Sequence, residues 1–205
     1  MLKLAVLASG RGSNFKALAD ASRRENSGFE IALLVSDHSD AGALDIAEQL
    51  SIPHLHLDPE HFASRREFET ELVSHFSHAG IGLIALAGYM RLAGKTLLRA
   101  FPGRIINIHP SLLPSFPGLE AQKQALNYGV RVSGCTVHFV DSGMDTGPII
   151  LQRSVPVLCS DTVSSLSERI LVEEHRAYPE AVSLIASGRV GLNGRTVMIQ
   201  KEGLK

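Results

Sequence analysis

Short apolar runs alternate with amphipathic stretches from the first residues of the chain, and this alternation constrains the fold more than any other feature. The runs 2–8 and 30–36 have the length and continuous apolar character of strands buried on both faces. The stretches 13–24 and 42–50 have the apolar spacing of helices. This order, with right-handed crossovers, predicts an α/β fold with a doubly wound, mostly parallel sheet, Rossmann-like, and helices on both faces.

The same alternation continues through the rest of the chain. Further strands are expected at 54–57, 81–88, 104–110, 134–140 and 148–157. Further helices are expected at 64–78, 95–101 and within 117–129. The longest helical pattern, 162–187, begins after the cap-like Asp161, and Pro179 predicts a kink or an interruption within it. Asn193-Gly194 predicts the turn of a hairpin in the tail.

Length and composition predict one globular domain over residues 1–205, because 44% of the residues are hydrophobic. Twenty basic and 21 acidic residues leave a formal charge of −1, which argues against a nucleic-acid partner. No stretch has the length of a membrane span or the form of a cleaved leader. Cys135 and Cys159 have no CxxC spacing and suggest neither a disulfide framework nor a zinc site. We therefore expect a soluble, cytoplasmic protein without a membrane partner. The sequence leaves open whether the protein forms a homodimer.

A glycine-rich turn, SGRGSN at 9–14, follows the first strand and opens the first helix. Backbone N–H groups at a helix start bind anions, and the two glycines allow close approach. Ser13 and Asn14 can add hydrogen bonds. The turn is neither a Walker A loop nor a dinucleotide fingerprint, since Phe15 replaces the third glycine. It predicts a monophosphate site, and the alternative is an ordinary turn with Ser13 as the helix cap.

Asn107, His109 and Asp145 form the candidate catalytic group. Asn107 and His109 alternate with isoleucines at the end of a strand, so both are expected on one face, at the edge where doubly wound folds bind ligands. Asp145, in the loop DSGMDTG, would orient the imidazole and favour its charged form. An amide and an imidazole beside an acid can stabilise an oxyanion. The alternative is that each residue has only a structural role.

Three other features of the sequence give weaker indications of function. His54 and His56 share a strand face but lack a third ligand, so no metal site is expected. His138 precedes the acidic loop, either behind the site or as a packed or solvent-facing side chain. The charged stretch 64–71 is interpreted as a solvated helix face with i,i+4 pairs such as Arg65 with Glu69.

Five segments, in order along most of the chain, closely resemble the phosphoribosylglycinamide formyltransferase family. They are SGRGSN (9–14), AGYMRL (87–92), NIHPSLLPSFPG (107–118), GCTVHFVDSGMDTGPII (134–150) and EEHRAYP (173–179). The resemblance implies an enzyme of purine biosynthesis. It would transfer the formyl group of 10-formyltetrahydrofolate, a co-substrate, to the amine of glycinamide ribonucleotide without a metal.

The same resemblance implies roles for individual residues. Asn107 and His109 would stabilise the tetrahedral oxyanion, while Asp145 would hold His109 and help to relay a proton. The residues implied to bind the ribonucleotide, through its phosphate and ribose, are Arg11, Gly12, Ser13, Asn14 and Glu174. The residues implied to bind the folate are Arg65, Met90, Arg91, Leu92, Ala93, Leu98, Asn107, Asp141, Ser142, Gly143, Met144 and Asp145.

Two alternatives stay open at this point. Formyltetrahydrofolate deformylases and methionyl-tRNA formyltransferases use the same chemistry, but each usually carries an extra domain for which this sequence shows no segment. A nucleotide-phosphate sensor that kept the fold would bind ligand without turnover. The catalytic group argues against the sensor, because a binding protein has no use for an acid–histidine pair.

Overall fold

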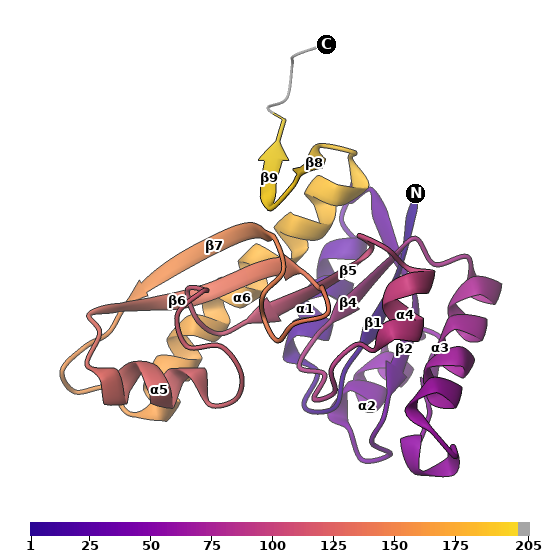
Figure 1. The fold of residues 1–205 in the computed structure, drawn as a ribbon, viewed down its shortest axis with the longest axis horizontal. Helices are drawn as coiled ribbons and strands as arrows, with labels where there is room; N and C mark the ends of the chain where they lie inside the picture. Colours follow the sequence, from indigo (N-terminus) through magenta and orange to yellow (C-terminus); the bar gives the residue numbers. More distant parts are fainter. Residues whose placement is uncertain (201–205) are drawn as a thin grey trace. The chain divides into compact units, whose positions relative to one another are not determined.

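The computed structural model describes residues 1–200, drawn in Figure 1. The chain forms two compact units, Met1–Asn107 and Ile108–Lys205. Strand β5 (Ile105–His109) crosses the boundary between them along the chain. No helix within residues 1–200 is both long and apolar enough to cross a membrane.

The first unit is a parallel sheet with strand order β3-β2-β1-β4-β5. The other strands are β1 (Leu2–Leu7), β2 (Phe29–Ser36), β3 (His54–His56) and β4 (Leu83–Leu86). Residues Leu4 to Leu7 of β1 have no exposed surface, as expected for a central parallel strand covered on both faces. This unit confirms the predicted parallel α/β fold.

The helices of this unit are α1 (Ser13–Ser22), α2 (Gly42–Gln49), α3 (Arg65–Ala79) and α4 (Lys95–Ala100), with a short 3₁₀ helix η1 (Pro59–His61) that the sequence analysis missed. Right-handed crossovers in this strand order place α1 and α2 on one face and α3 and α4 on the other. In agreement, α1 packs with α2 and α3 packs with α4. The strand order reverses between β1 and β4, so their carboxyl ends form the topological switch point where doubly wound folds bind ligands.

The second unit contains an antiparallel pair of strands, β6 (Val132–Phe139) and β7 (Ile149–Pro156). Helix α6 (Val163–Ala186) packs on both strands, and α5 (Ala121–Tyr128) packs on α6. A separate hairpin, β8 (Val190–Asn193) and β9 (Thr196–Ile199), ends the described chain. The hairpin is confirmed, but its two-residue turn is Gly194-Arg195 instead of Asn193-Gly194, since Asn193 pairs with Thr196.

Helix α6 corrects two details of the sequence analysis. The interruption expected at Pro179 is wrong, because the helix continues to Ala186. Buried residues lie on both sides of the proline, including Ile170 and Val182, so the apolar face that packs on the strands outweighs one lost backbone hydrogen bond. The cap is Thr162, whose hydroxyl accepts from the N–H of Ser165, and not Asp161.

Candidate active site

His109, at the end of β5, has a ring that is 7% exposed and has both nitrogens near oxygen atoms. Nε2 lies 2.9 Å from the carbonyl oxygen of Phe116, and Nδ1 lies 3.4 Å from Oδ2 of Asp145. Asn107 precedes it by two residues on the same strand and is half-buried, while the alternating Ile106 and Ile108 are buried. The strand period therefore presents Asn107 and His109 on one face, as predicted.

Asp145 is held in place by a backbone hydrogen bond and by its own backbone conformation. Its Oδ2 accepts the backbone N–H of Gly118 at 2.8 Å, and its side chain is 12% exposed. Its backbone has a φ of 56°, a left-handed conformation that costs energy for most residues but which Asp and Asn tolerate. The predicted approach of Asp145 to His109 is therefore present in the structure.

His138 is the residue whose place the sequence left open. It is 2% exposed, its Nδ1 donates to the carbonyl oxygen of Phe139 at 2.8 Å, and its Nε2 lies 3.7 Å from Oδ1 of Asp145. Burial lowers its pKa, opposed in part by the hydrogen bond to Phe139 and the charge of Asp145. Asp145 thus lies near two imidazoles. The signal available in the sequence was the place of His138 near the end of β6, just before the acidic loop.

The loop that carries Asp145 is held by its own side chains. Oδ1 of Asp141 accepts from the N–H of Gly143 at 2.9 Å and from the hydroxyl of Thr146 at 2.6 Å. At Gly147, a Cβ would lie 1.7 Å from the carbonyl oxygen of Phe139, so only glycine fits. Asp141 therefore shapes the loop. Ser142, Gly143 and Met144 are exposed, and Met144 retains 52% of its surface.

The segment 110–118, which follows β5, carries Phe116 and Gly118, whose backbone groups contact the side chains of His109 and Asp145. The Leu113-Pro114 bond is cis, and both Phe116 and Gly118 have positive φ values, 55° and 79°. Ser111 donates its hydroxyl hydrogen to the carbonyl oxygen of Ser115. Sequence reasoning missed these backbone contacts because its only signal was the density of proline and glycine after His109.

The glycine-rich turn opens α1 with Gly12 at the N-cap, and no side chain caps this helix. Ser13 is the first helical residue, so the expectation that Ser13 would be the helix cap in an ordinary turn is wrong in that detail. Gly12 has a φ of 78°, and a Cβ there would lie 2.7 Å from the Cα of Ala43. The backbone amides at the start of α1 are therefore not occupied by a capping side chain, which suits an anion.

The turn is linked to the predicted pterin segment within the first unit. The hydroxyl of Ser9 accepts the backbone N–H of Met90 at 3.0 Å. Arg65 donates through Nη2 to the carbonyl oxygen of Leu92 and through Nε to Glu69 at 3.1 Å. Met90 and Leu92 retain 65% and 53% of their surface. The structure thus brings Arg65 to the segment 90–93, whose apolar side chains are exposed.

The remaining folate candidates of this unit lie beside the same helices. The guanidinium of Arg91 lies 5.8 Å from the ring centroid of Phe68, a cation–π contact. Ala93 and Leu98 are half-buried, Leu98 on α4 and Ala93 just before it. Arg11 and Gly12 of the turn differ in burial, since Arg11 is exposed and Gly12 is buried, and Ser13 after them is half-buried.

Glu174 lies on α6 and is 7% exposed. Burial raises the pKa of the Cys135 thiol to about 12, and the charge of Glu174 adds to this effect. The same two causes raise the pKa of Tyr178. A thiol with such a pKa is protonated at neutral pH and does not act as a nucleophile, so Cys135 is a packing residue.

These observations describe an α/β protein with an anion-type turn and a buried acid–histidine pair. The model of the formyl transferase family matches residues 2–182. The chain belongs to the formyl transferase family.

Comparison with individual proteins narrows this class. The chain is 46% identical over 195 residues to phosphoribosylglycinamide formyltransferase of Bacillus subtilis (strain 168), which covers 95% of this chain and 98% of that protein. The crystal structure of glycinamide ribonucleotide transformylase 1 from Symbiobacterium toebii matches with a TM-score of 0.96 and 51% identity, covering 98% of this chain and 95% of that one. That of phosphoribosylglycinamide formyltransferase from Anaplasma phagocytophilum matches with a TM-score of 0.91 and 39% identity, covering 99% and 96%. The predicted fold class and the predicted enzyme class, a phosphoribosylglycinamide formyltransferase, are confirmed.

Proposed function

We propose that the protein transfers the formyl group of 10-formyltetrahydrofolate to the amine of glycinamide ribonucleotide in purine biosynthesis, with Asn107, His109 and Asp145 as the catalytic residues. The observation that carries the mechanism is the approach of Asp145 to Nδ1 of the buried His109. The match to phosphoribosylglycinamide formyltransferases along nearly the whole chain supports the choice of substrates. We also propose that residues 1–205 are one formyltransferase domain acting in the cytoplasm.

In the proposed mechanism the substrate amine attacks the formyl carbon directly. A new carbon–nitrogen bond forms, and the carbonyl oxygen becomes an oxyanion. The amide of Asn107 and Nε2–H of the His109 ring donate hydrogen bonds to this oxygen. When the tetrahedral intermediate collapses, the bond to N10 of the folate breaks, and the proton lost by the amine reaches N10 by way of water held by Asp145.

This mechanism requires His109 to exchange one partner. Nε2 bonds to the carbonyl oxygen of Phe116 in the structure, whereas Nδ1 faces Asp145. To donate to the oxyanion, Nε2 must break its hydrogen bond to the carbonyl oxygen of Phe116. The contact between Nδ1 and Asp145 stays in place. The hydrogen bond from Gly118 fixes Asp145 during this exchange.

Binding roles are proposed for residues of both units. In the first unit, the backbone and side chains of Gly12, Ser13 and Asn14, with Arg11 beside them, hold the ribonucleotide phosphate. Arg65, Leu98 and the four residues 90–93 hold the folate, partly through backbone groups. In the second unit, Glu174 accepts hydrogen bonds from ribose hydroxyls, and the loop 141–145 contacts the pterin. No step in this mechanism calls on a metal.

A steady-state assay with 10-formyltetrahydrofolate tests the substrate assignment. Glycinamide ribonucleotide, initiator methionyl-tRNA and water are compared as formyl acceptors, with release of tetrahydrofolate as the common readout. Turnover that depends on glycinamide ribonucleotide is expected. Hydrolysis without an added acceptor would instead identify a deformylase, and ribonucleotide binding without turnover would identify a sensor.

A further inference from the structure

The hairpin β8–β9, which the proposed mechanism does not use, is attached to the rest of the second unit at both ends. At its base, the backbone N–H of Arg189 donates to the carbonyl oxygen of Leu184, in the last turn of α6, at 3.1 Å. At its tip, Nη2 of Arg195 donates to the carbonyl oxygen of Thr146 at 2.8 Å. Strand β9 contacts β7 between these points. The hairpin therefore reaches from the end of α6 to the loop that carries Asp145.

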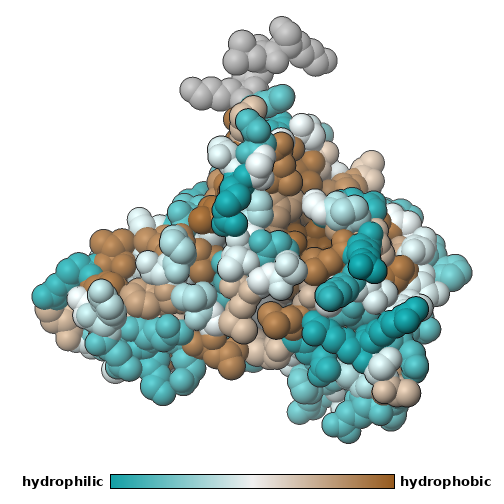
Figure 2. Space-filling model, in the orientation of Figure 1, coloured by the Kyte–Doolittle hydropathy of each residue, from teal (hydrophilic) through white to brown (hydrophobic). Residues whose placement is uncertain are grey.

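The contact at the tip lies on the surface of the second unit. Figure 1 shows the turn of the hairpin toward the start of β7, and Figure 2 shows hydrophilic residues over the hairpin on the same face. Arg195 and Thr146 are both exposed. Within residues 1–200, Arg195 forms no ion pair with a carboxylate, so its guanidinium is directed to the backbone of the loop. A charged donor makes a stronger hydrogen bond to a carbonyl oxygen than a neutral donor does.

The loop depends on such contacts because Asp145 has an uncommon backbone conformation. A left-handed φ of 56° costs energy and persists only where the surrounding structure holds it. Thr146, the next residue, is held twice, since its hydroxyl donates to Oδ1 of Asp141 at 2.6 Å and its carbonyl oxygen accepts from Arg195. Gly118 holds the side chain of Asp145. The hairpin thus restrains the loop on the carboxyl side of the catalytic acid.

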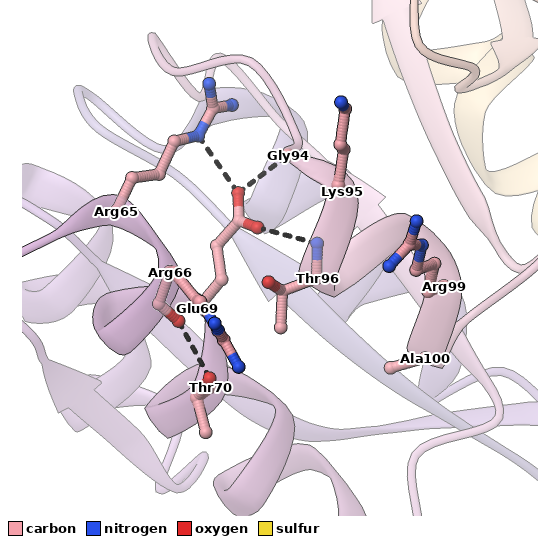
Figure 3. Close-up of a pocket in the computed structure, with 9 residues that line it drawn as sticks. All are labelled: Arg65, Arg66, Glu69, Thr70, Gly94, Lys95, Thr96, Arg99 and Ala100. Atoms are coloured by element: carbon pink, nitrogen blue, oxygen red, sulfur yellow. Dashed lines mark hydrogen bonds and ion pairs between the residues drawn. The ribbon is translucent and has the colours of Figure 1, made fainter.

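The first unit also contains a side chain that fixes the backbone beside a proposed binding segment (Figure 3). Glu69 on α3 is 4% exposed, and its oxygens accept the N–H groups of Gly94 at 2.5 Å and Thr96 at 3.2 Å. The expectation that the charges of 64–71 form a solvated face is therefore wrong for Glu69. These N–H groups lie just after the segment assigned to the folate. Glu69 holds that backbone through its N–H groups, whereas Arg195 holds the catalytic loop through a carbonyl oxygen.

We propose that Arg195 is a positioning residue for formyl transfer, which keeps the carboxylate of Asp145 at His109 by holding the carbonyl oxygen of Thr146. This inference rests on the proposed function, because Arg195 acts through Asp145. Oδ2 of Asp145 lies 3.4 Å from Nδ1 of His109, and catalysis that depends on such a contact is sensitive to shifts of about 1 Å. Loss of one hydrogen bond to the loop is expected to lower kcat by about 3- to 10-fold.

The first experiment measures formyl transfer to glycinamide ribonucleotide in steady state. Arg195→Ala should lower kcat by about 3- to 10-fold and change both KM values by less than about twofold, because Arg195 contacts neither substrate. Arg195→Lys retains a cationic donor and should recover part of the lost kcat. Arg131→Ala is the control, because it removes an exposed arginine that contacts Cys159 near the other end of β6, and it is expected to keep the wild-type kcat.

The double variant Arg195→Ala/Asp145→Asn separates positioning from a general loss of structure. If Arg195 acts through Asp145, its removal lowers kcat no further once the carboxylate charge is gone. Equal fold losses in the two backgrounds would overturn the inference, and so would an unchanged kcat in Arg195→Ala. A higher KM without a lower kcat would also overturn it, because Arg195 would then bind a substrate.

NMR of the histidine rings tests the inference without turnover. If the wild type does not transfer the formyl group to glycinamide ribonucleotide, the proposed function fails, and the ring signals of His109 still report the place of Asp145. These signals are assigned by their loss in His109→Gln and compared among the wild type, Arg195→Ala and Arg131→Ala. A shift in Arg195→Ala alone would support the positioning role, and identical signals in all three proteins would overturn it.

Discussion

Oδ2 of Asp145 lies 3.4 Å from Nδ1 of His109 and accepts, at 2.8 Å, the backbone N–H of Gly118. One carboxylate oxygen thus joins the imidazole to the chain segment that follows it. The histidine is 5% exposed, so its two ring nitrogens meet protein oxygens and little solvent. The orientation of the imidazole is therefore set by the same contacts that shape the segment 110–118.

Asp145→Asn should lower kcat by about 10²- to 10⁴-fold with much smaller changes in KM, because it removes the charge and leaves the shape of the site. Asparagine tolerates the left-handed backbone at this position and retains an oxygen for the N–H of Gly118. Asp141→Asn removes a carboxylate from the same loop but keeps an oxygen for the N–H of Gly143 and the hydroxyl of Thr146, so it is expected to change kcat by less than about tenfold, which corresponds to about one hydrogen bond. Steady-state kinetics at saturating substrates checks both. Near-wild-type turnover in Asp145→Asn would exclude the mechanism.

Ser13→Asp should raise the KM for the ribonucleotide by about tenfold or more, because it places a negative charge against the bound phosphate. Ser22→Asp adds the same charge at the other end of α1, where the turn does not reach, and is expected to leave this KM unchanged. Both variants are compared in steady-state assays with the ribonucleotide varied. An unchanged KM in Ser13→Asp would remove the turn from the substrate site.

Gly12→Ala should lower the free energy of unfolding by about 1–3 kcal/mol, because a side chain there is forced into the left-handed region. It would also place a Cβ 2.7 Å from the Cα of Ala43. Gly10 is two residues away, and a Cβ there has no atom within 4 Å. Gly10→Ala is therefore expected to be neutral or to stabilise the fold by up to about 1 kcal/mol. Chemical denaturation of the two variants measures the difference, and equal losses would contradict the argument.

The sequence was sufficient for the features that depend on local periodicity. Alternation of Asn107 and His109 with isoleucines located the histidine of the acid–histidine pair, and the βαβ pattern located the sheet. It was insufficient where tertiary contacts decide the outcome. Glu69 follows a helical charge pattern that is typical of a solvent-exposed face, yet α4 lies over it and buries it.

Pro179 and His138 illustrate the same limit. A proline breaks an isolated helix, but here the buried residues on both sides hold α6 together. His138 alternates in a strand like many packed histidines, and only the path of the loop 141–147 brings Asp145 near its ring. Long-range contacts of this kind have no local pattern in the sequence.

Stability should fall as the pH is lowered from about 7.5 to about 5.5, through the range in which unfolded histidines gain protons, near a pKa of about 6.5. Burial lowers the pKa of both His138 and His175 in the folded protein. As the pH falls through about 6.5 the unfolded chain therefore binds protons that the folded chain does not, so stability is full near pH 7.5 and declines through this range. His138→Gln/His175→Gln should flatten this part of the curve of stability against pH.

The slope of the unfolding free energy between the two pH values is the readout, so that a uniform loss of stability in the variant does not obscure the result. The depressed pKa of Asp161, which is due first to its hydrogen bonds from Arg169, makes a separate acid-side contribution, below about pH 4. A slope equal to that of the wild type in the double variant would show that these two histidines do not set the acid limb.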